Sequence, residues 1–280
     1  MIRIRHETRY DFAVAPSLGL QRLRLWPAPC RVQRVHSWTV SLEGLSVEAR
    51  FTDSHGNAVM LASINADATV VIARVEGEVE PLGDDGVVGP HEGSPLAQYG
   101  RATPLTKAGG GILRLAAELE PADLASFHRL SDAIRERMPW TVGATDAATD
   151  AESALAGGRG VCQDHAHVFV AACRARGVPA RYVSGYLLMD DREEQEASHA
   201  WAEAHLGGLG WVGFDVSNGY SPDLRYVRLA TGLDYLDAAP VTGLLRFPPG
   251  AGAGDGTERA QRLSVSLNVA RVAAQSQSQQ

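Results

Sequence analysis

Residues 157–169 read GGRGVCQDHAHVF, and the fold of the surrounding chain depends on this stretch. A glycine run ends abruptly at Cys162, and apolar side chains then recur at helical spacing as far as Arg176. The pattern predicts a helix that begins at or near Cys162. Because the first N–H groups of a helix are unpaired and its dipole is positive there, a thiolate is favoured at this position. The glycines leave room for a substrate, so Cys162 is a candidate nucleophile.

Two strands that follow this helix carry a candidate base and a candidate orienting residue. Residues 198–205, SHAWAEAH, alternate in polarity and contain His199 at their start, whereas residues 211–216, WVGFDV, contain Asp215 near their end. The glycines of 207–210 predict a hairpin between the two strands. If the strands pair antiparallel, His199 and Asp215 lie at the same end of the hairpin. A cysteine, a histidine and an aspartate in this order are typical of thiol acyl transfer.

The sequence resembles the bacterial transglutaminase-like family, whose members carry a papain-like Cys-His-Asp triad. The first hundred residues also resemble the β-rich N-terminal region that accompanies this domain in bacteria, including DSHGN at 53–57. The resemblance implies that Cys162, His199 and Asp215 are the catalytic residues. The stretches that carry it are GVCQD at 160–164, RYVSGY at 181–186, SHAW at 198–201 and GFD at 213–215.

Composition limits the classes of function. The chain has 280 residues, of which 45% are hydrophobic, enough for one large or two small packed domains. Its net charge of −7 argues against a general nucleic-acid or anionic-membrane surface. No window is apolar enough for a transmembrane helix, and the first residues lack the features of a signal peptide. Three cysteines at wide spacing form no disulfide framework, so we expect a cytoplasmic protein.

The chain divides into a β-rich part and an α+β part. We expect residues 1–95 to form an N-terminal β-sandwich-like domain, because short alternating stretches are separated by turns. Within it, Asp53 and Asn57 are interpreted as hydrogen-bonding residues of a tight turn. Residues 96–248 are expected to form the catalytic domain, after a linker rich in glycine and proline. A glycine-rich loop and a C-terminal strand follow at 249–272, and 273–280 is expected to be a disordered tail.

The second part is predicted to place helices before an antiparallel sheet. This order indicates an α+β class with a papain-like or transglutaminase-like core, in which the Cys162 helix packs on the sheet. Residues 217–247 are expected to form loops and short turns. The C-terminal strand pairs either with this sheet or with the N-terminal one. Helices are predicted at 113–119, at 121–138, after a cap at Thr149 and at 162–176, and strands at 180–189, 199–206, 211–216 and 262–272.

Gln163, Trp140, His165 and Trp201 are candidates for the oxyanion hole or for substrate binding. The backbone N–H of Cys162 is one expected oxyanion donor. The second is either Gln163, through its backbone or side chain, or the indole N–H of Trp140, which is equally suited to a hydrophobic contact. His165 stands where relatives usually have an aromatic residue, and it is expected to tune or line the site. Relatives commonly have proline and threonine where this chain has Val216-Ser217.

A metal site is the alternative for Cys162, His165 and His167. Positions i and i+3 of a helix share a face, but i+5 lies on the opposite side, so only two of the three side chains can converge. The sequence contains no second cluster with zinc spacing and no acidic cluster with calcium-loop spacing. We therefore expect neither a metal nor another cofactor. Cys30 and Cys173 are interpreted as structural cysteines.

The expected reaction is attack by Cys162 on a peptide or carboxamide carbonyl, with His199 as general base and a thioester intermediate. We favour hydrolysis, as in a protease or amidase. The alternatives are transglutaminase-type cross-linking to an amine and a catalytically inactive peptide-binding module on the same scaffold. The expected partner is a peptide or protein substrate, with an amine acceptor as an option, and neither nucleic acid nor a membrane.

An acidic segment precedes the strand of the candidate base. Residues 189–196 read MDDREEQE and predict a solvated loop. A sharper hypothesis is that Glu193, Glu194 and Glu196 flank the cleft and favour basic groups on the substrate.

Overall fold

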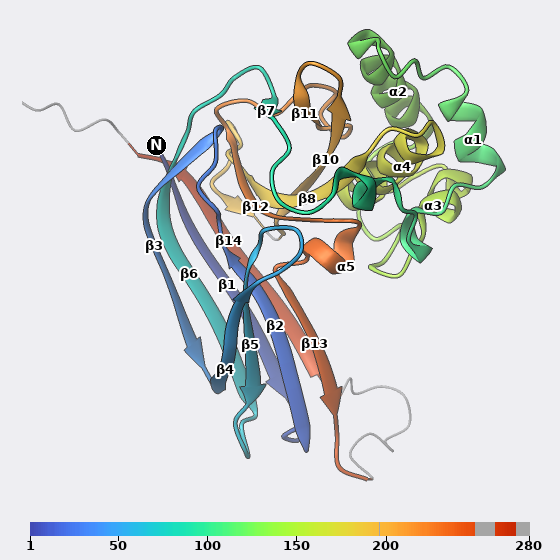
Figure 1. Cartoon of the computed structure of the whole chain (residues 1–280). Helices are drawn as coiled ribbons and strands as arrows, with labels where there is room; N and C mark the ends of the chain where they lie inside the picture. Colours follow the sequence, from blue (N-terminus) through green and yellow to red (C-terminus); the bar gives the residue numbers. More distant parts are fainter. Residues whose placement is uncertain (196, 250–260, 273–280) are drawn as a thin grey trace, which may run out of the picture.

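A computed structural model describes residues 1–195, 197–249 and 261–272 (Figure 1). Its strands form three antiparallel sheets. The first has the order β3-β6-β1-β14-β9, the second β13-β2-β5-β4 and the third β12-β8-β10-β11-β7. Glu196, nearly all of the expected glycine-rich loop and the expected tail lie outside the described residues.

The strands and helices have the following bounds. The first sheet contains β1 (Ile2–Phe12), β3 (Gln33–Glu43), β6 (Val70–Pro81), β9 (Glu194–Gln195) and β14 (Gln261–Arg271). The second contains β2 (Leu18–Trp26), β4 (Leu45–Thr52), β5 (Ala58–Ile64) and β13 (Val241–Arg246). The third contains β7 (Val87–Gly89), β8 (Ala180–Leu187), β10 (His199–Leu206), β11 (Gly210–Phe214) and β12 (Tyr226–Gly232). The α-helices are α1 (Gly110–Ala116), α2 (Leu124–Arg137), α3 (Ala151–Gly157), α4 (Cys162–Ala175) and α5 (Tyr235–Ala238), with 3-10 turns at Leu96–Gly100 and Pro104–Thr106.

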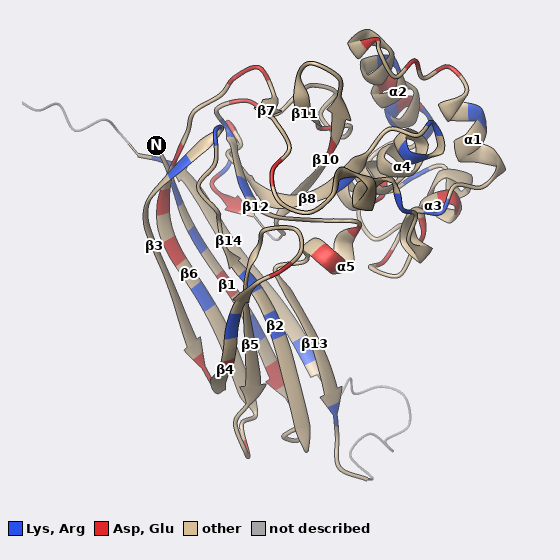
Figure 2. Ribbon diagram, in the orientation of Figure 1, with Lys and Arg blue, Asp and Glu red and all other residues tan. Residues whose placement is uncertain are grey.

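The first two sheets share one apolar core. Phe12 of β1, Leu23 of β2, Met60 of β5 and Val75 of β6 are all buried in the same cluster. Side chains alternate across each strand, so the outward positions of β1 and β6 are charged (Figure 2). Arginines of one strand pair there with glutamates of the next, which gives this face its bands of opposite charge.

The C-terminal strand was predicted with two possible sheets, and β7, β9, β12 and β13 were not predicted as strands. β14 pairs with β1 along its whole length, so the C-terminal strand joins the N-terminal sheet. The prediction of loops over 217–247 is wrong where β12 pairs with β8 and β13 pairs with β2. Sequence periodicity predicted β14 without its partner and gave no signal for β12 and β13, because the partners of these strands lie far away along the chain. The 1–95 and 96–248 division stays a prediction about independent domains, since these pairings cross it.

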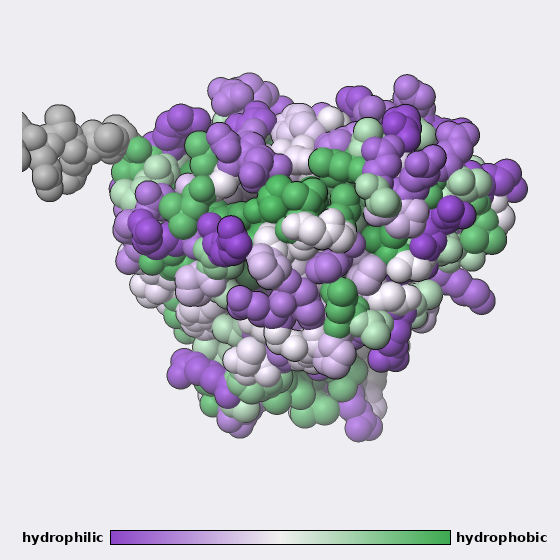
Figure 3. Space-filling model, turned by 45° about the horizontal axis from the view of Figure 1, so that its top comes forward, coloured by the Kyte–Doolittle hydropathy of each residue, from purple (hydrophilic) through white to green (hydrophobic). Residues whose placement is uncertain are grey.

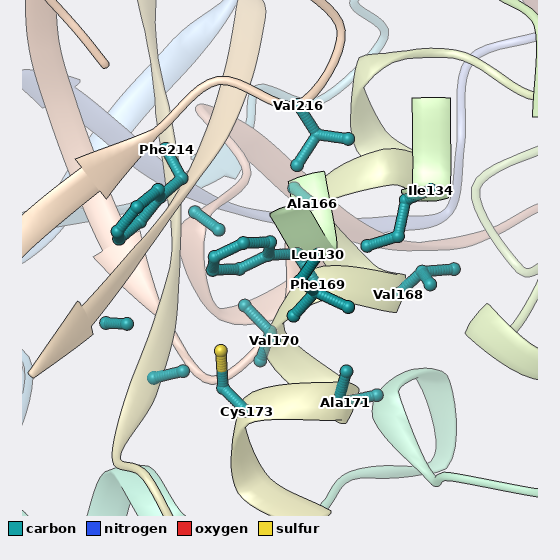
Figure 4. Close-up of a cluster of buried hydrophobic side chains, with 14 of the residues drawn as sticks. Leu130, Ile134, Ala166, Val168, Phe169, Val170, Ala171, Cys173, Phe214 and Val216 are labelled. Atoms are coloured by element: carbon teal, nitrogen blue, oxygen red, sulfur yellow. The ribbon is translucent and has the colours of Figure 1, made fainter. Parts of the chain in front are cut away.

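Helix α4 lies against the third sheet, in contact with β10 and β8 (Figure 1). Its inward side chains form the centre of a large apolar cluster (Figure 4). The ring of Phe169 stacks on that of Phe214 in β11, with centroids 4.9 Å apart. Helices α1, α2 and α3 contact other faces of α4, and its residues from Asp164 to Arg174 are buried. The first turn of α4 is therefore fixed relative to the sheet.

Three predicted helix starts are wrong. Helix α1 begins at Gly110 rather than at Leu113. Helix α2 begins at Leu124 rather than at Pro121, because the Asp123 side chain accepts a hydrogen bond from the N–H of Ala125 and caps the helix there. Helix α3 is capped by Asp150, whose carboxylate accepts from the N–H of Ser153. The expected cap, Thr149, donates its hydroxyl to Asp146 instead. For α2 and α3, an aspartate one or two residues after the predicted position is the better-placed acceptor.

The turn at 53–57 joins the β-rich part to the third sheet. Asp53 accepts hydrogen bonds from the N–H groups of His55 and Asn57, which is the expected role of a tight-turn residue. The Asn57 amide reaches further. It donates to the carbonyl of Thr231 at 2.7 Å and accepts from the N–H of the same residue at 2.8 Å. This pair of bonds replaces a strand partner at the edge strand β12.

The outer surface of the described residues includes an apolar band. It crosses the face where the β-rich part meets the helices, with hydrophilic residues around it (Figure 3). Apolar surface bordered by polar residues is a common place for ligands and partners. No helix in the described part of the chain has the length and apolar character needed to cross a membrane.

Candidate active site

His199 and Asp215 are brought together by the hairpin of β10 and β11. The two strands pair from Ala202 opposite Phe214 to Leu206 opposite Gly210, so both side chains lie at the open end. The Nε2 atom of His199 is 2.5 Å from Oδ2 of Asp215. Because a carboxylate only accepts, Nε2 carries the proton of this bond. Nδ1 is the ring nitrogen left to face another group.

Asp215 accepts hydrogen bonds from two further side chains besides that of His199. Its carboxylate is fully buried and also accepts from the Tyr226 hydroxyl at 2.6 Å and from the Asn218 side-chain amide at 2.7 Å. Burial by itself raises the pKa of Asp215, but the His199 charge and these hydrogen bonds outweigh it and lower the pKa below its usual value. Asp215 is therefore built to remain ionised.

Sequence reasoning missed Tyr226 and Asn218. The Asn-Gly pair at 218–219 is a turn signal, and it could have pointed to Asn218 as a residue that folds back on Asp215. Tyr226 lies in β12, which was not predicted, and nothing in its local sequence marks it.

Cys162 is the first residue of α4 and is partly exposed. The start of the helix is held by Asp164, whose Oδ2 accepts from the N–H of Val161 at 2.8 Å and from the Thr145 hydroxyl at 2.6 Å. Gly160 makes this close approach possible, because a Cβ there would lie only 2.7 Å from Oδ2 of Asp164. The glycine run thus has a structural reason as well as the expected one of space for a substrate.

Cys162 lies close enough to His199 to affect its pKa. Burial lowers the pKa of His199, but the charge and hydrogen bond of Asp215, together with the neighbouring Cys162 thiol, outweigh burial and raise the pKa to about 10. In the structure the imidazole is therefore hydrogen-bonded to the carboxylate, and the Cys162 thiol lies near the imidazole.

The other candidate residues occupy different positions. Trp140 is 59% exposed and pairs with Gly160 in an isolated bridge, beside the run that leads to Cys162. The Gln163 amide points to the carbonyl of Asp146 at 3.5 Å. Trp201 is buried and its ring packs edge-on against Tyr226 with centroids 5.4 Å apart, so it supports the site from behind and offers a substrate no surface.

His165 and His167 do not converge with Cys162 as metal ligands. His165 is buried, does not line the site, and bonds to the Met138 carbonyl and the Ser217 hydroxyl. Nε2 of His167 accepts from the N–H of Tyr235, and burial lowers the pKa of His167 to about 3. Among the described residues, no group of three His, Cys, Asp or Glu side chains is arranged to hold a metal ion.

Part of the acidic segment is a strand rather than a loop. Glu194 and Gln195 form β9, which pairs with Leu267 and Asn268 of β14. Glu194 also accepts a hydrogen bond from the Asn268 amide at 2.9 Å. The segment is thereby tied to the N-terminal sheet just before the chain turns into β10.

Comparisons with known proteins cover both parts of the chain. Residues 114–216 match the family model of the transglutaminase-like superfamily, and residues 2–80 match that of the bacterial transglutaminase-like N-terminal region. The fold is similar to that of a candidate cysteine protease from Cytophaga hutchinsonii. The TM-score is 0.74 at 20% identity, over 96% of this chain and 89% of the other.

Two uncharacterised mycobacterial proteins are related in sequence. One from Mycobacterium leprae (strain TN) is 34% identical over 144 residues, which are 50% of this chain and 47% of the relative. One from Mycobacterium tuberculosis (strain ATCC 25618 / H37Rv) is 36% identical over 113 residues, which are 37% of this chain and 36% of the relative. The chain therefore spans less than half the length of these curated relatives. Since the two family models match in the order expected from the motifs, the chain belongs to the transglutaminase-like superfamily and carries its bacterial N-terminal region.

Proposed function

We propose that the protein is a cysteine-dependent acyl-transfer enzyme that hydrolyses peptide or carboxamide bonds. The observation that carries the proposal is the buried Asp215 carboxylate, which holds Nε2 of His199 at 2.5 Å and leaves Nδ1 for Cys162. A base with a fixed tautomer beside a thiol at a helix start is the arrangement that nucleophilic catalysis needs.

The reaction would proceed in two halves. Nδ1 of His199 takes the proton of Cys162, and the thiolate adds to the substrate carbonyl. The backbone N–H of Cys162 donates to the resulting oxyanion, and Gln163 and Trp140 are the candidates for the second donor. The protonated His199 then gives its proton to the leaving amine, and a thioester remains. Water, deprotonated by His199, attacks the thioester and releases the acid and the free thiol.

Hydrolysis is favoured over amine transfer by the access of solvent. Both Cys162 and His199 are partly exposed, so water reaches a thioester formed at this place. Transfer to an amine needs a bound acceptor that displaces this water. The proposed substrate is a peptide or protein, and the proposed setting is a reducing cytoplasm, since Cys30, Cys162 and Cys173 are all unpaired.

The test is the rate of iodoacetamide alkylation at each cysteine, followed by mass spectrometry over a range of pH. Cys162 should react faster than Cys30, and His199→Ala should slow Cys162 alone. Cys173 should react only after unfolding, because it is fully buried and burial raises its pKa. His36→Ala is the matched control, since His36 is an exposed partner of Glu80 in the N-terminal sheet.

Two outcomes would redirect the proposal. If Cys162 reacts no faster than Cys30 and His199→Ala leaves the alkylation rate unchanged, the proposal of an enzyme is rejected and the protein is interpreted as a peptide-binding module. Such a module would bind peptides tightly without turnover, even as Cys162→Ala. If Cys162 is activated, amide substrates with and without a labelled amine separate hydrolysis from cross-linking. If more labelled amine is incorporated than free acid is released, the proposal of a hydrolase is rejected in favour of cross-linking.

A further inference from the structure

The ring of His165 uses both of its nitrogens in hydrogen bonds. His165 is 1% exposed, its Nε2 lies 2.7 Å from the carbonyl oxygen of Met138, and its Nδ1 lies 2.7 Å from Oγ of Ser217. A carbonyl oxygen only accepts, so Nε2 carries the proton and Nδ1 accepts from the Ser217 hydroxyl. Burial lowers the pKa of His165, which favours this neutral form.

These bonds join three segments of the site. His165 follows Cys162 by three residues on α4, so the two side chains lie on one face of the helix. Met138 is the C-cap of α2 and leads directly to the bridge between Trp140 and Gly160. Ser217 comes two residues after Asp215. A single side chain thus connects the helix of the nucleophile to the turn of the orienting carboxylate.

The turn that contains Ser217 is closed by hydrogen bonds that do not connect it to α4. The N–H of Gly219 donates to the carbonyl of Asp215 at 2.8 Å, the N–H of Asp215 donates to the carbonyl of Tyr220 at 2.9 Å, and the Asn218 amide donates to the Asp215 carboxylate. Val216 is buried in the same apolar cluster as Ala166 of α4, but apolar packing has little directional preference. Valine also does not fix φ as a proline would. The hydrogen bond to His165 is the directional contact between this turn and α4.

We propose that His165 and Ser217 are positioning residues that set the placement of the Asp215–His199 pair relative to Cys162. The inference rests on the proposed function, because it concerns the geometry of the same triad. His165 itself touches neither substrate nor the reacting atoms. It acts by holding the Asp215 turn at a fixed distance from the first turn of α4.

The experiment measures Cys162 alkylation as a function of pH in four proteins: wild type, Ser217→Ala, Ser217→Thr and Ser221→Ala. Ser217 is half-buried, so its replacement by alanine leaves the core intact. Ser217→Ala should slow alkylation near neutral pH about tenfold, because a small misplacement of the base is costly. Ser217→Thr keeps the hydroxyl and should restore the rate to within about twofold. Ser221→Ala removes a hydroxyl from the same loop that is not bonded to His165 and should have no effect.

A second variant tests the partner. His165→Phe keeps a planar ring but removes both hydrogen bonds of His165. In the double variant with Ser217→Ala, Cys162 should be alkylated no more slowly than in His165→Phe alone, since each change removes the same contact between His165 and Ser217. A merely structural role would lower the thermal midpoint without changing the pH profile of alkylation. The proposal is overturned if Ser217→Ala leaves rate and profile unchanged while His199→Ala still slows Cys162. If His199→Ala has no effect either, it is the proposed function that fails.

Discussion

The hydroxyl of Tyr226 donates a hydrogen bond to Oδ2 of Asp215 at 2.6 Å, the same oxygen that accepts from His199. Tyr226 comes from β12, which pairs with β8 on the side of the sheet away from β11. Its ring also packs edge-on against Trp201. The carboxylate is therefore positioned by a strand outside the hairpin that carries the histidine, and the site depends on the assembly of the whole sheet.

Tyr226→Phe should destabilise the protein by about 2 kcal/mol at neutral pH, because a buried hydrogen bond to a charged group is lost. The pKa of Asp215 lies below its usual value in the folded protein, so its stabilising effect is present above the unfolded pKa of about 4 and is lost as the pH falls below it. The variant should lose less stability on acidification. Urea unfolding between neutral and acidic pH measures both effects, with Tyr10→Phe in β1 as the control.

Asp215→Asn should lower the pKa of His199, because the charge and hydrogen bond of Asp215 raise it in the native protein. A raised pKa means that the pair stabilises the fold below the unfolded histidine pKa of about 6.5 and that this contribution is lost as the pH rises through the folded value. The variant should therefore lose less stability on alkalinisation. NMR titration of the His199 ring gives the pKa directly, and an unchanged midpoint would contradict the role of Asp215.

Glu203→Gln should destabilise the protein by about 3–5 kcal/mol, because it leaves two buried guanidinium groups without a counter-charge. Glu203 is fully buried between Arg181 at 2.6 Å and Arg228 at 2.7 Å. The control is Glu76→Gln, an exposed partner of Arg5, which should cost less than about 1 kcal/mol.

The same variant tests a pH effect. Burial raises the pKa of Glu203, but the two arginines outweigh it and bring the pKa below its usual value. The stabilisation is present above the unfolded pKa of about 4.3 and is lost as the pH falls below it, so Glu203→Gln should flatten the acid side of the stability profile. An acid limb identical to that of the wild type would show that Glu203 is not its source.

Asn57→Ala should destabilise the protein by about 3 kcal/mol, because it leaves the buried N–H and carbonyl of Thr231 without their partners. Asn65→Ala is the control, since the Asn65 side chain accepts from the Ser46 hydroxyl at an exposed turn and its backbone bonds are kept. Thermal unfolding compares the two variants. Equal thermal midpoints for the two variants would mean that the hydrogen bonds of Asn57 do not stabilise β12.

The amino-acid sequence determined the local features of the site. The glycine run and the apolar spacing after it marked the start of α4 at Cys162, and the alternating stretch marked β10 with His199 at its start. These features are set by side chains within a few residues of one another, as helix and strand periods are. The family motifs predicted the matched core and N-terminal region for the same reason.

Only the tertiary structure decided which distant segments complete the site and the sheets. Tyr226 reaches Asp215 because β12 pairs with β8, and Ser217 meets His165 across an interval of 52 residues. The C-terminal strand joins β1, although its alternation suits either sheet. Leu244 of β13 is 65% exposed, so the apolar residues of this strand do not all face the core and give no clear alternation. Strand pairing satisfies backbone hydrogen bonds that every residue has, and its choice of partner follows from the packing of the whole chain.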